Sequence, residues 1–172
     1  MPKQQDLCED SRLLRLLADE LLEYAQARQQ TIVTAESCSA GMLAFAFAKG
    51  NGASQAFLGG FVAYTKEMKS RVLGVPPSLM KEKTAVCGEV ADAMAIGALL
   101  QSDASIGVSI TGVAGPDADE DGNPVGLVYC AVARKDGGHR HVRLNSAGQT
   151  PEAVIEEACS CALKLVKSFC FS

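Results

Sequence analysis

The sequence contains no tryptophan, only two histidines and no run of lysines or arginines. With so little histidine, a Ser-His-Asp or Cys-His catalytic site has weak support, because such sites use histidine as the general base. The net charge of −4 and a pI near 5.2 also argue against binding to nucleic acid, which requires a basic surface. These absences leave a small molecule as the expected partner.

Long apolar runs and paired cysteines are absent as well. No stretch approaches the roughly 20 apolar residues of a membrane-spanning helix, and the opening MPKQQDLCED has no apolar signal core. We therefore expect a cytoplasmic protein that has no membrane partner. The seven cysteines lack the C-x-x-C spacing of a zinc site or a redox dithiol, so we interpret them as reduced, mostly buried thiols and expect neither metal nor cofactor.

What is present fits one soluble domain, which we place at 1–172, with 48% hydrophobic and 21% charged residues. Helical spacing of apolar residues predicts helices, and short β-branched or apolar runs between turn residues predict strands. The expected helices cover 7–29, 39–50, 66–74, 76–86, 88–102 and 150–169, and the expected strands cover 31–37, 56–65, 104–112, 126–135 and 139–145. This order predicts an α/β fold, a single three-layer domain in which helices cover a mixed β-sheet.

Three of the expected strands run into polar loops that contain glycine or hydroxyl groups: TAESCSAG, AYTKEMK and TGVAGPD. Ligands of such sheets bind outside the carboxyl ends of the strands. We therefore expect one site assembled from these three loops.

A nucleophile in this site would need a base other than histidine, and lysine is the usual substitute when it is desolvated. The loop AYTKEMK places Tyr64 at a strand end and Lys66 and Lys69 just beyond it, while Ser37 ends the preceding strand. A Ser/Lys/Tyr hydrolytic site is one interpretation of this pattern. Ordinary solvated lysines beside a packed tyrosine are the other.

The stretch TAESCSAG also has two interpretations. Ser37 or Ser39 could cap the following helix, with Gly41 allowing close packing, or the same helix start could offer backbone N–H groups to a developing oxyanion. Cys38 has no histidine among its expected neighbours, so a buried structural thiol is the preferred interpretation.

The remaining polar motifs are weaker. His139 and His141 share one face of an expected strand, where a solvated face is favoured over a metal site because no further ligands stand nearby. The loop TGVAGPD is not a Walker motif, and the acidic run PDADEDG overlaps it, so at most one or two of its amides are expected to contact a ligand.

Four segments in unbroken order carry a family resemblance: TAESCSAGMLA, FLGGFVAYTKEMKSRVLGVP, GEVADAMAIGA and SITGVAGPD…NPVGLVYCAVA. They resemble the C-terminal domain family of CinA, the competence/damage-inducible proteins, which includes stand-alone nicotinamide-nucleotide amidases. The resemblance implies an amidohydrolase acting on a linear amide, which converts nicotinamide mononucleotide to nicotinate mononucleotide and ammonia in NAD recycling. It also implies a homodimer, a nucleotide substrate and no cofactor.

The family's motif residues fall on Ser37, Tyr64 and Lys69. The implied mechanism has Ser37 attacking the carboxamide carbon, Lys69 taking its proton, and Tyr64 relaying a proton or holding the lysine. The resemblance further implies oxyanion donors between Cys38 and Gly41 and a wall for the ribose phosphate at the TGVAGPD loop. The expected substrate-binding residues are Glu36, Cys38, Ser39, Ala40, Gly41, Lys66, Thr111 and Gly112.

The sequence departs from the family pattern at three places. Ala40 stands where the family has glycine, Lys66 stands where it has asparagine, and the closing helix lacks the arginines that suit a nucleotide phosphate. Lys66 could lower the pKa of Lys69 or bind phosphate. The departures keep an alternative open: a catalytically inactive or altered-substrate paralogue that acts as a small-ligand-binding or regulatory protein.

Overall fold

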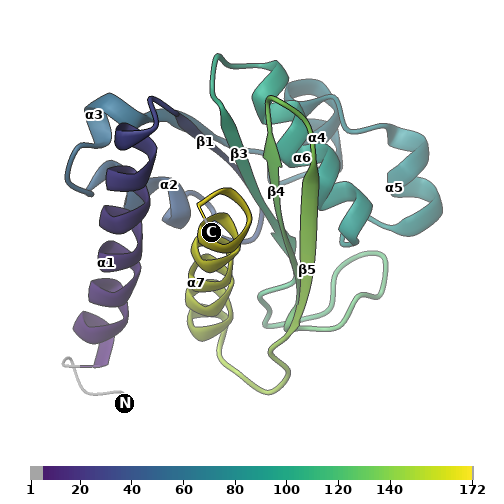
Figure 1. Ribbon diagram of the computed structural model, residues 1–172. Helices are drawn as coiled ribbons and strands as arrows, with labels where there is room; N and C mark the ends of the chain where they lie inside the picture. Colours follow the sequence, from purple (N-terminus) through teal and green to yellow (C-terminus); the bar gives the residue numbers. More distant parts are fainter. Residues whose placement is uncertain (1–5, 172) are drawn as a thin grey trace.

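A computed structural model describes residues 6–171, with side chains from residue 12 onward (Figure 1). The elements, in chain order, are α1 (Asp6–Ala27), β1 (Ile32–Glu36), α2 (Met42–Ala48), α3 (Ala53–Ala56), β2 (Phe57–Val62), α4 (Lys66–Leu73), α5 (Pro77–Lys83), α6 (Gly88–Leu100), β3 (Ile106–Gly112), β4 (Leu127–Arg134), β5 (His139–Asn145) and α7 (Pro151–Cys170). Each expected helix and strand is present. The short α3 was not expected from the sequence.

The five strands form one mixed sheet in the order β2-β1-β3-β4-β5. β1 pairs in parallel with both β2 and β3, whereas β3, β4 and β5 pair antiparallel. β1 therefore lies between the two strands that run in its own direction, and the carboxyl ends of all three meet at one edge. The predicted α/β class with a mixed sheet is confirmed.

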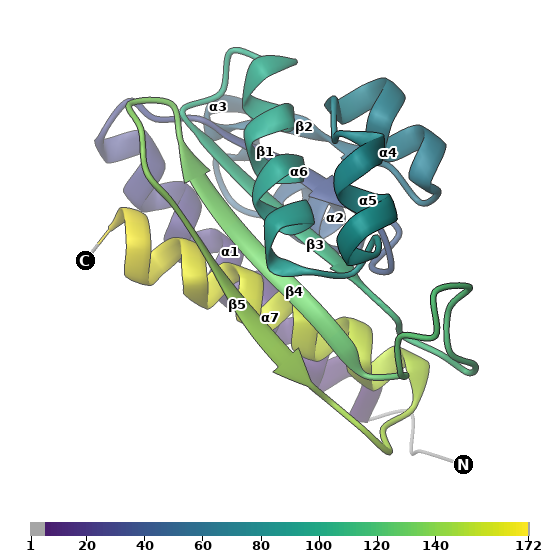
Figure 2. The ribbon, with the colours of Figure 1, turned by 90° about the vertical axis from the view of Figure 1, so that its right-hand side faces the viewer.

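Helices cover both faces of the sheet (Figure 2). One face packs against α1, α2 and α7 around Leu21, Phe47 and Leu163, and the other packs against α4, α5 and α6 around Met94. Every residue of β1 is buried as a result. This explains why its sequence does not alternate between apolar and exposed polar residues, as that of a strand with one solvent-facing side would. In the described part of the chain, no helix has the length and apolar character needed to cross a membrane.

Candidate active site

The three loops expected to form a site lie side by side at the carboxyl end of the parallel strands. Ser37 directly follows β1, and its N–H donates to the carbonyl of Ile110 in β3 at 3.0 Å. On the other side, the N–H of Ala63, which directly follows β2, donates to the carbonyl of Glu36 at 2.8 Å. The turn after β1 is thus fixed against both neighbouring strands.

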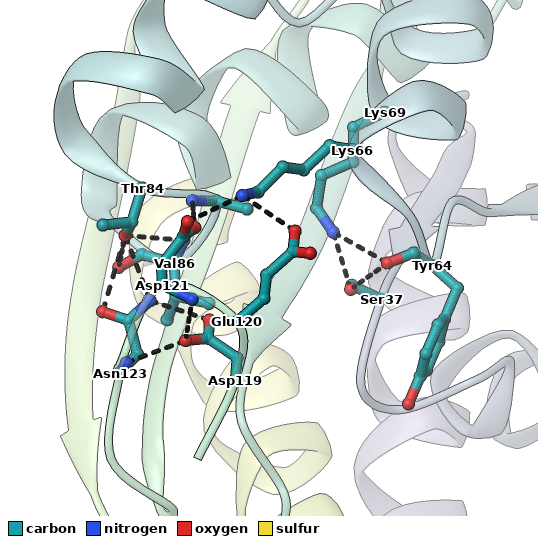
Figure 3. A network of polar contacts seen from close by, with 11 residues as sticks. Ser37, Tyr64, Lys66, Lys69, Thr84, Val86, Asp119, Glu120, Asp121 and Asn123 are labelled. Carbon is teal, nitrogen blue, oxygen red and sulfur yellow. Dashed lines mark hydrogen bonds and ion pairs between the residues drawn. The ribbon is translucent and has the colours of Figure 1, made fainter.

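Ser37 and Lys69 are in direct contact across this edge. The Nζ atom of Lys69 lies 2.8 Å from Oγ of Ser37 and 3.3 Å from the carbonyl oxygen of Tyr64 (Figure 3). It also lies 3.3 Å from the carbonyl oxygen of Ala63. Lys69 reaches this position from the first turns of α4, whose N-cap Thr65 accepts from the N–H of Met68 at 3.2 Å. The residue pattern alone named both Lys66 and Lys69, and the family resemblance implied Lys69; in the structure Lys69 is the lysine that contacts Ser37.

Burial makes Lys69 a candidate base. The residue is only 3% exposed, and this loss of hydration lowers the pKa of its ammonium group from 10.5 to about 8. The nearby positive charge of Lys66 lowers the pKa of Lys69 further, whereas the Cys38 thiol and the Asp119 carboxylate act in the opposite direction. A substantial fraction of Lys69 is therefore neutral at mildly alkaline pH.

The neighbours of Lys69 suit both of its protonation states. As an ammonium, it donates one hydrogen bond to Ser37 and one to each carbonyl. As a neutral amine, it keeps two N–H groups for the two carbonyls and turns its lone pair toward the Ser37 hydroxyl. Since the two carbonyls hold the nitrogen in place, loss of a proton converts Lys69 into an acceptor for Ser37 without a change of position.

Glu36 organises the turn that carries Ser37. Its carboxylate is fully buried and accepts from the hydroxyls of Thr34 and Ser39 and from the N–H groups of Gly41, Leu43 and Ala44, at 2.7–3.2 Å. The N–H groups of Leu43 and Ala44 belong to the first turn of α2. The interpretation in which Ser37 or Ser39 caps this helix is therefore wrong, because a carboxylate from the preceding strand accepts from the N–H groups of its first turn.

Two backbone N–H groups of the same turn have no oxygen acceptor among the described residues; they lie against the Cys38 sulfur, where they act to lower the pKa of its thiol against the larger, raising effect of burial. The N–H groups of Cys38 and Ser39 donate to no oxygen atom within residues 6–171, whereas those on either side of them do. Ala40 and Gly41 both adopt left-handed conformations, with φ of 50° and 100°. This explains the family's preference for glycine at the position of Ala40, since an L residue is strained there.

A cavity of about 480 Å³, a volume typical of small-molecule sites, opens beside the Ser37–Lys69 pair. Of the expected site residues, those that line it are Ser37, Cys38, Tyr64, Lys66, Lys69 and Gly112. Those that lie outside its lining are Glu36, Ser39, Ala40, Gly41 and Thr111. Thr111 is buried and donates to the carbonyl of Ala85 at 2.9 Å, so its hydroxyl has a structural partner.

Tyr64 differs from expectation in the group that it contributes. Its backbone carbonyl accepts from Lys69, while its phenol ring points away from the Ser37–Lys69 contact and the residue is 67% exposed (Figure 3).

Cys38 is buried, and burial raises the pKa of its thiol to about 11. A protonated thiol is a poor nucleophile, which agrees with the structural interpretation of this cysteine.

Sequence reasoning placed the loop between β3 and β4 at the site but missed the acidic side chains that this loop contributes. This loop places Asp117, Asp119 and Glu120 along the cavity. It is tied to α4 by Lys66, whose Nζ pairs with Glu120 at 2.8 Å and with Asp121 at 2.7 Å, and these contacts raise the pKa of Lys66. The acidic run was visible in the sequence, but its partner stands more than 50 residues earlier and nothing local indicated the pairing.

His139 and His141 lie away from the cavity beside Ser37. Both are on β5, two strands away from β3, and Nδ1 of His141 lies 2.8 Å from Oδ2 of Asp92 in α6. This contact joins an edge strand to the helix that covers it. Neither histidine lines the cavity beside Ser37.

The chain is similar to known proteins over most of its length. The sequence model of the CinA C-terminal domain family matches residues 15–170 of this chain. A CinA-like protein of Synechococcus sp. is 45% identical over 121 residues, which cover 70% of this chain and 29% of that protein. A putative competence-damage inducible protein of Desulforamulus reducens is 41% identical over 140 residues, covering 81% of this chain and 33% of that protein. The chain thus spans about a third of the length of these curated relatives.

Solved structures of similar length share the fold. The competence/damage inducible protein CihA of Agrobacterium tumefaciens has a TM-score of 0.87 at 30% identity, covering 91% of this chain and 94% of that one. A CinA superfamily protein of Escherichia coli has a TM-score of 0.84 at 33% identity, covering 89% of this chain and 88% of that one. Sequence and fold therefore agree that the chain belongs to the CinA C-terminal domain family.

Proposed function

We propose that this chain is a serine amidohydrolase that hydrolyses the carboxamide of a nicotinamide nucleotide, with nicotinamide mononucleotide as the substrate that the family resemblance implies. The observation that carries the proposal is the 2.8 Å contact between Nζ of the buried Lys69 and Oγ of Ser37 at a cavity of about 480 Å³. A hydroxyl beside a lysine with a lowered pKa is a known arrangement for an activated nucleophile.

Acylation begins when neutral Lys69 accepts the hydroxyl proton of Ser37. The Oγ atom forms a bond to the carboxamide carbon, and the resulting tetrahedral intermediate carries its negative charge on the former carbonyl oxygen. The C–N bond then breaks, and Lys69 returns the proton to the departing nitrogen, which leaves as ammonia. The product of this half-reaction is an ester between the nicotinoyl group and Ser37.

Deacylation repeats the sequence with water. Lys69 accepts a proton from a water molecule as its oxygen attacks the ester carbon, and then donates this proton to Oγ of Ser37 as the ester bond breaks. The products are a carboxylic acid and the free enzyme. The carbonyls of Ala63 and Tyr64 hold Nζ of Lys69 in one place through both half-reactions.

The N–H groups of Cys38 and Ser39 are the proposed oxyanion donors. They follow the nucleophile directly, and no oxygen atom of the described residues accepts from them. Glu36 would hold them in position through its five hydrogen bonds to the same turn and to its surroundings. For Tyr64 we propose contact between its exposed ring and the substrate in place of a proton relay.

The test is ammonia release from nicotinamide mononucleotide by the wild type, by Ser37→Ala and by Lys69→Met. We expect release from the wild type and a loss of at least about a thousandfold in both variants, since nucleophile and base act as a unit. Ser160→Ala and Lys81→Met remove the same groups outside the cavity and should keep full activity. Release that survives Ser37→Ala would exclude Ser37 as nucleophile, and a ligand-induced rise in melting temperature without turnover would indicate a binding protein.

A further inference from the structure

We propose that Cys161 and Cys130 form a thiol pair that a hydroperoxide oxidises to a disulfide, which joins α7 to β4. Neither cysteine lines the cavity beside Ser37, so this modification site is separate from the candidate active site. The inference does not depend on the proposed function, because its tests measure the state of the sulfur atoms rather than the release of ammonia.

The two thiols meet where α7 packs against the sheet. The helix lies along the face formed by β3, β4 and β5 (Figure 2). The Sγ atom of Cys130 in β4 lies 3.4 Å from the carbonyl oxygen of Ala158 in α7. Cys161 stands three residues further along the same helix, so it lies on the same face, and its thiol is hydrogen-bonded to that of Cys130. The contact gives the two sulfur atoms the proximity that a disulfide requires.

The pair combines an accessible thiol with a buried one. Cys161 is partly exposed and lines a groove of about 460 Å³ between α7 and β5, together with Val142, Leu144 and Lys164. Cys130 is fully buried behind it. An oxidant in the solvent therefore reaches Cys161 first, and Cys130 is placed to resolve the oxidised sulfur.

The surroundings favour the thiolate of Cys161. The hydrogen bond from the Cys130 thiol lowers the pKa of Cys161, and the positive charge of Lys164 lowers it further, against the opposing effects of burial and of the Glu157 carboxylate. The same hydrogen bond, together with burial, raises the pKa of Cys130 well above its ordinary value. The thiolate is the form that attacks a peroxide, so Cys161 is the nucleophile of the pair.

Other cysteines of the chain are held as thiols. Burial raises the pKa of Cys38, of Cys87 and of Cys159. Cys38 and Cys159 are also buried in the core, and both act on the pKa of Cys130, so they lie near enough to serve as rival partners. The identity of the disulfide that forms is therefore a test of the geometry.

Cys170 provides a matched control within α7. It is partly exposed, as Cys161 is, and it stands in the last turn of the same helix. Burial raises the pKa of its thiol to about 11, and the charged groups that act on it are Arg134 and Asp136 rather than another thiol. Cys170 should therefore resist the oxidant that modifies Cys161.

The oxidation has two steps. The Cys161 thiolate forms an S–O bond with one oxygen of hydrogen peroxide as the O–O bond breaks, and the leaving hydroxide takes up a proton to become water. The sulfur of Cys130 then attacks the sulfenic acid, the S–S bond forms as the S–O bond breaks, and the leaving hydroxide combines with the proton of the Cys130 thiol. In total the two thiols lose two hydrogen atoms, and the peroxide is reduced to water.

Peptide mass spectrometry of the wild type after brief exposure to hydrogen peroxide tests the pair. With the remaining thiols alkylated in denaturant and no reductant added, fragment spectra should show two peptides joined through Cys130 and Cys161, which dithiothreitol separates. Cys170 should be recovered as an alkylated thiol. A disulfide that joins Cys130 to Cys159 or Cys38, or recovery of Cys161 as an unmodified thiol, would overturn the inference.

Variants separate the two steps. In Cys130→Ala, which keeps the buried position apolar, Cys161 has lost its resolving partner, and dimedone should label its sulfenic acid several-fold more than in the wild type. In Cys161→Ser, Cys130 should be recovered as a thiol, whereas Cys170→Ser should still form the disulfide. Equal labelling of Cys161 in the wild type and in Cys130→Ala would exclude Cys130 as the resolving thiol.

Reaction rates test the electrostatic cause. The pKa of Cys161 lies below the ordinary 9.0 and that of Cys170 is about 11. At pH 7 the thiolate fraction of Cys161 is therefore at least about a hundredfold larger, and the lower nucleophilicity of the more acidic thiol offsets about tenfold of this gain. Cys161 should react with hydrogen peroxide at least about tenfold faster than Cys170, and equal rates would overturn the inference.

The charge of Lys164 is tested in the same assay. Lys164→Gln removes the positive charge that lines the groove beside Cys161 and should slow its oxidation about two- to threefold. The matched control is Lys81→Gln, which removes a lysine of α5 and should leave the rate unchanged. Equal effects of the two substitutions would contradict a local activation of Cys161.

Discussion

Replacing Lys69 by methionine should change the way in which stability depends on pH. Lys69 has a pKa of about 8 in the folded protein and 10.5 as its ordinary value, so the folded state binds fewer protons than the unfolded state between these two values. The cost of burying the charged form is then complete below pH 8 and disappears as the pH rises to 10.5. At 1.36 kcal/mol for each pKa unit, this cost is about 3 kcal/mol.

The measurement is urea unfolding of the wild type and Lys69→Met across this pH range. The free energy of unfolding of Lys69→Met, minus that of the wild type, should fall by about 3 kcal/mol between pH 7 and 10.5. Groups other than Lys69 titrate in both proteins, and their contributions cancel in the difference. The hydrogen bonds lost by the variant add a constant that does not depend on pH. Lys81→Met, which removes an exposed lysine, should show no such slope.

A difference in unfolding free energy that stays constant with pH would refute this reasoning. It would mean that Lys69 titrates near its ordinary value and stays charged in the folded protein well above pH 8. Lys69 could then not act as the base for Ser37, however short their contact.

Three further predictions follow from the site. If ammonia is released, log kcat/KM should rise with pH up to about 8 and then level off, because only neutral Lys69 accepts the Ser37 proton; a profile without this inflection would exclude the assigned base. Ala40→Gly should raise the free energy of unfolding by roughly 1 kcal/mol by relieving the φ of 50°, whereas Ala118→Gly, at an exposed alanine without a positive φ, should not. Glu36→Gln replaces one acceptor oxygen by a donor group and leaves two or three donors unpaired, so thermal unfolding should show a loss of about 2–5 kcal/mol; an unchanged melting temperature would contradict its structural role.

The elements of the fold and the meeting of three loops were predictable from the sequence, because both depend on local patterns. Apolar periodicity located the helices and strands, and the rule for parallel strands brought the ends of β1, β2 and β3 together. The end of α5 was placed too late, at residue 86, since the positive φ of Thr84, 70°, which ends the helix, has no clear sequence signal.

The finer features of the site depend on contacts that no local pattern encodes. Lys66 and Lys69 stand three residues apart on one helix, and only the packing of α4 shows that Lys69 is the buried one. Tyr64 contributes a backbone carbonyl to Lys69, and any residue could supply this group. Glu36 was expected beside the substrate and instead organises the turn from below the surface, because its partners are backbone N–H groups.

The most direct test of the central claim is to identify the residue that becomes acylated. Quenching the wild type with acid during turnover of nicotinamide mononucleotide, followed by peptide mass spectrometry, should find the acyl group on Ser37. Lys69→Met should show no such adduct, since the hydroxyl lacks its base. An acyl group on Cys38, or turnover with no adduct on Ser37 under conditions that trap the ester, would contradict the account.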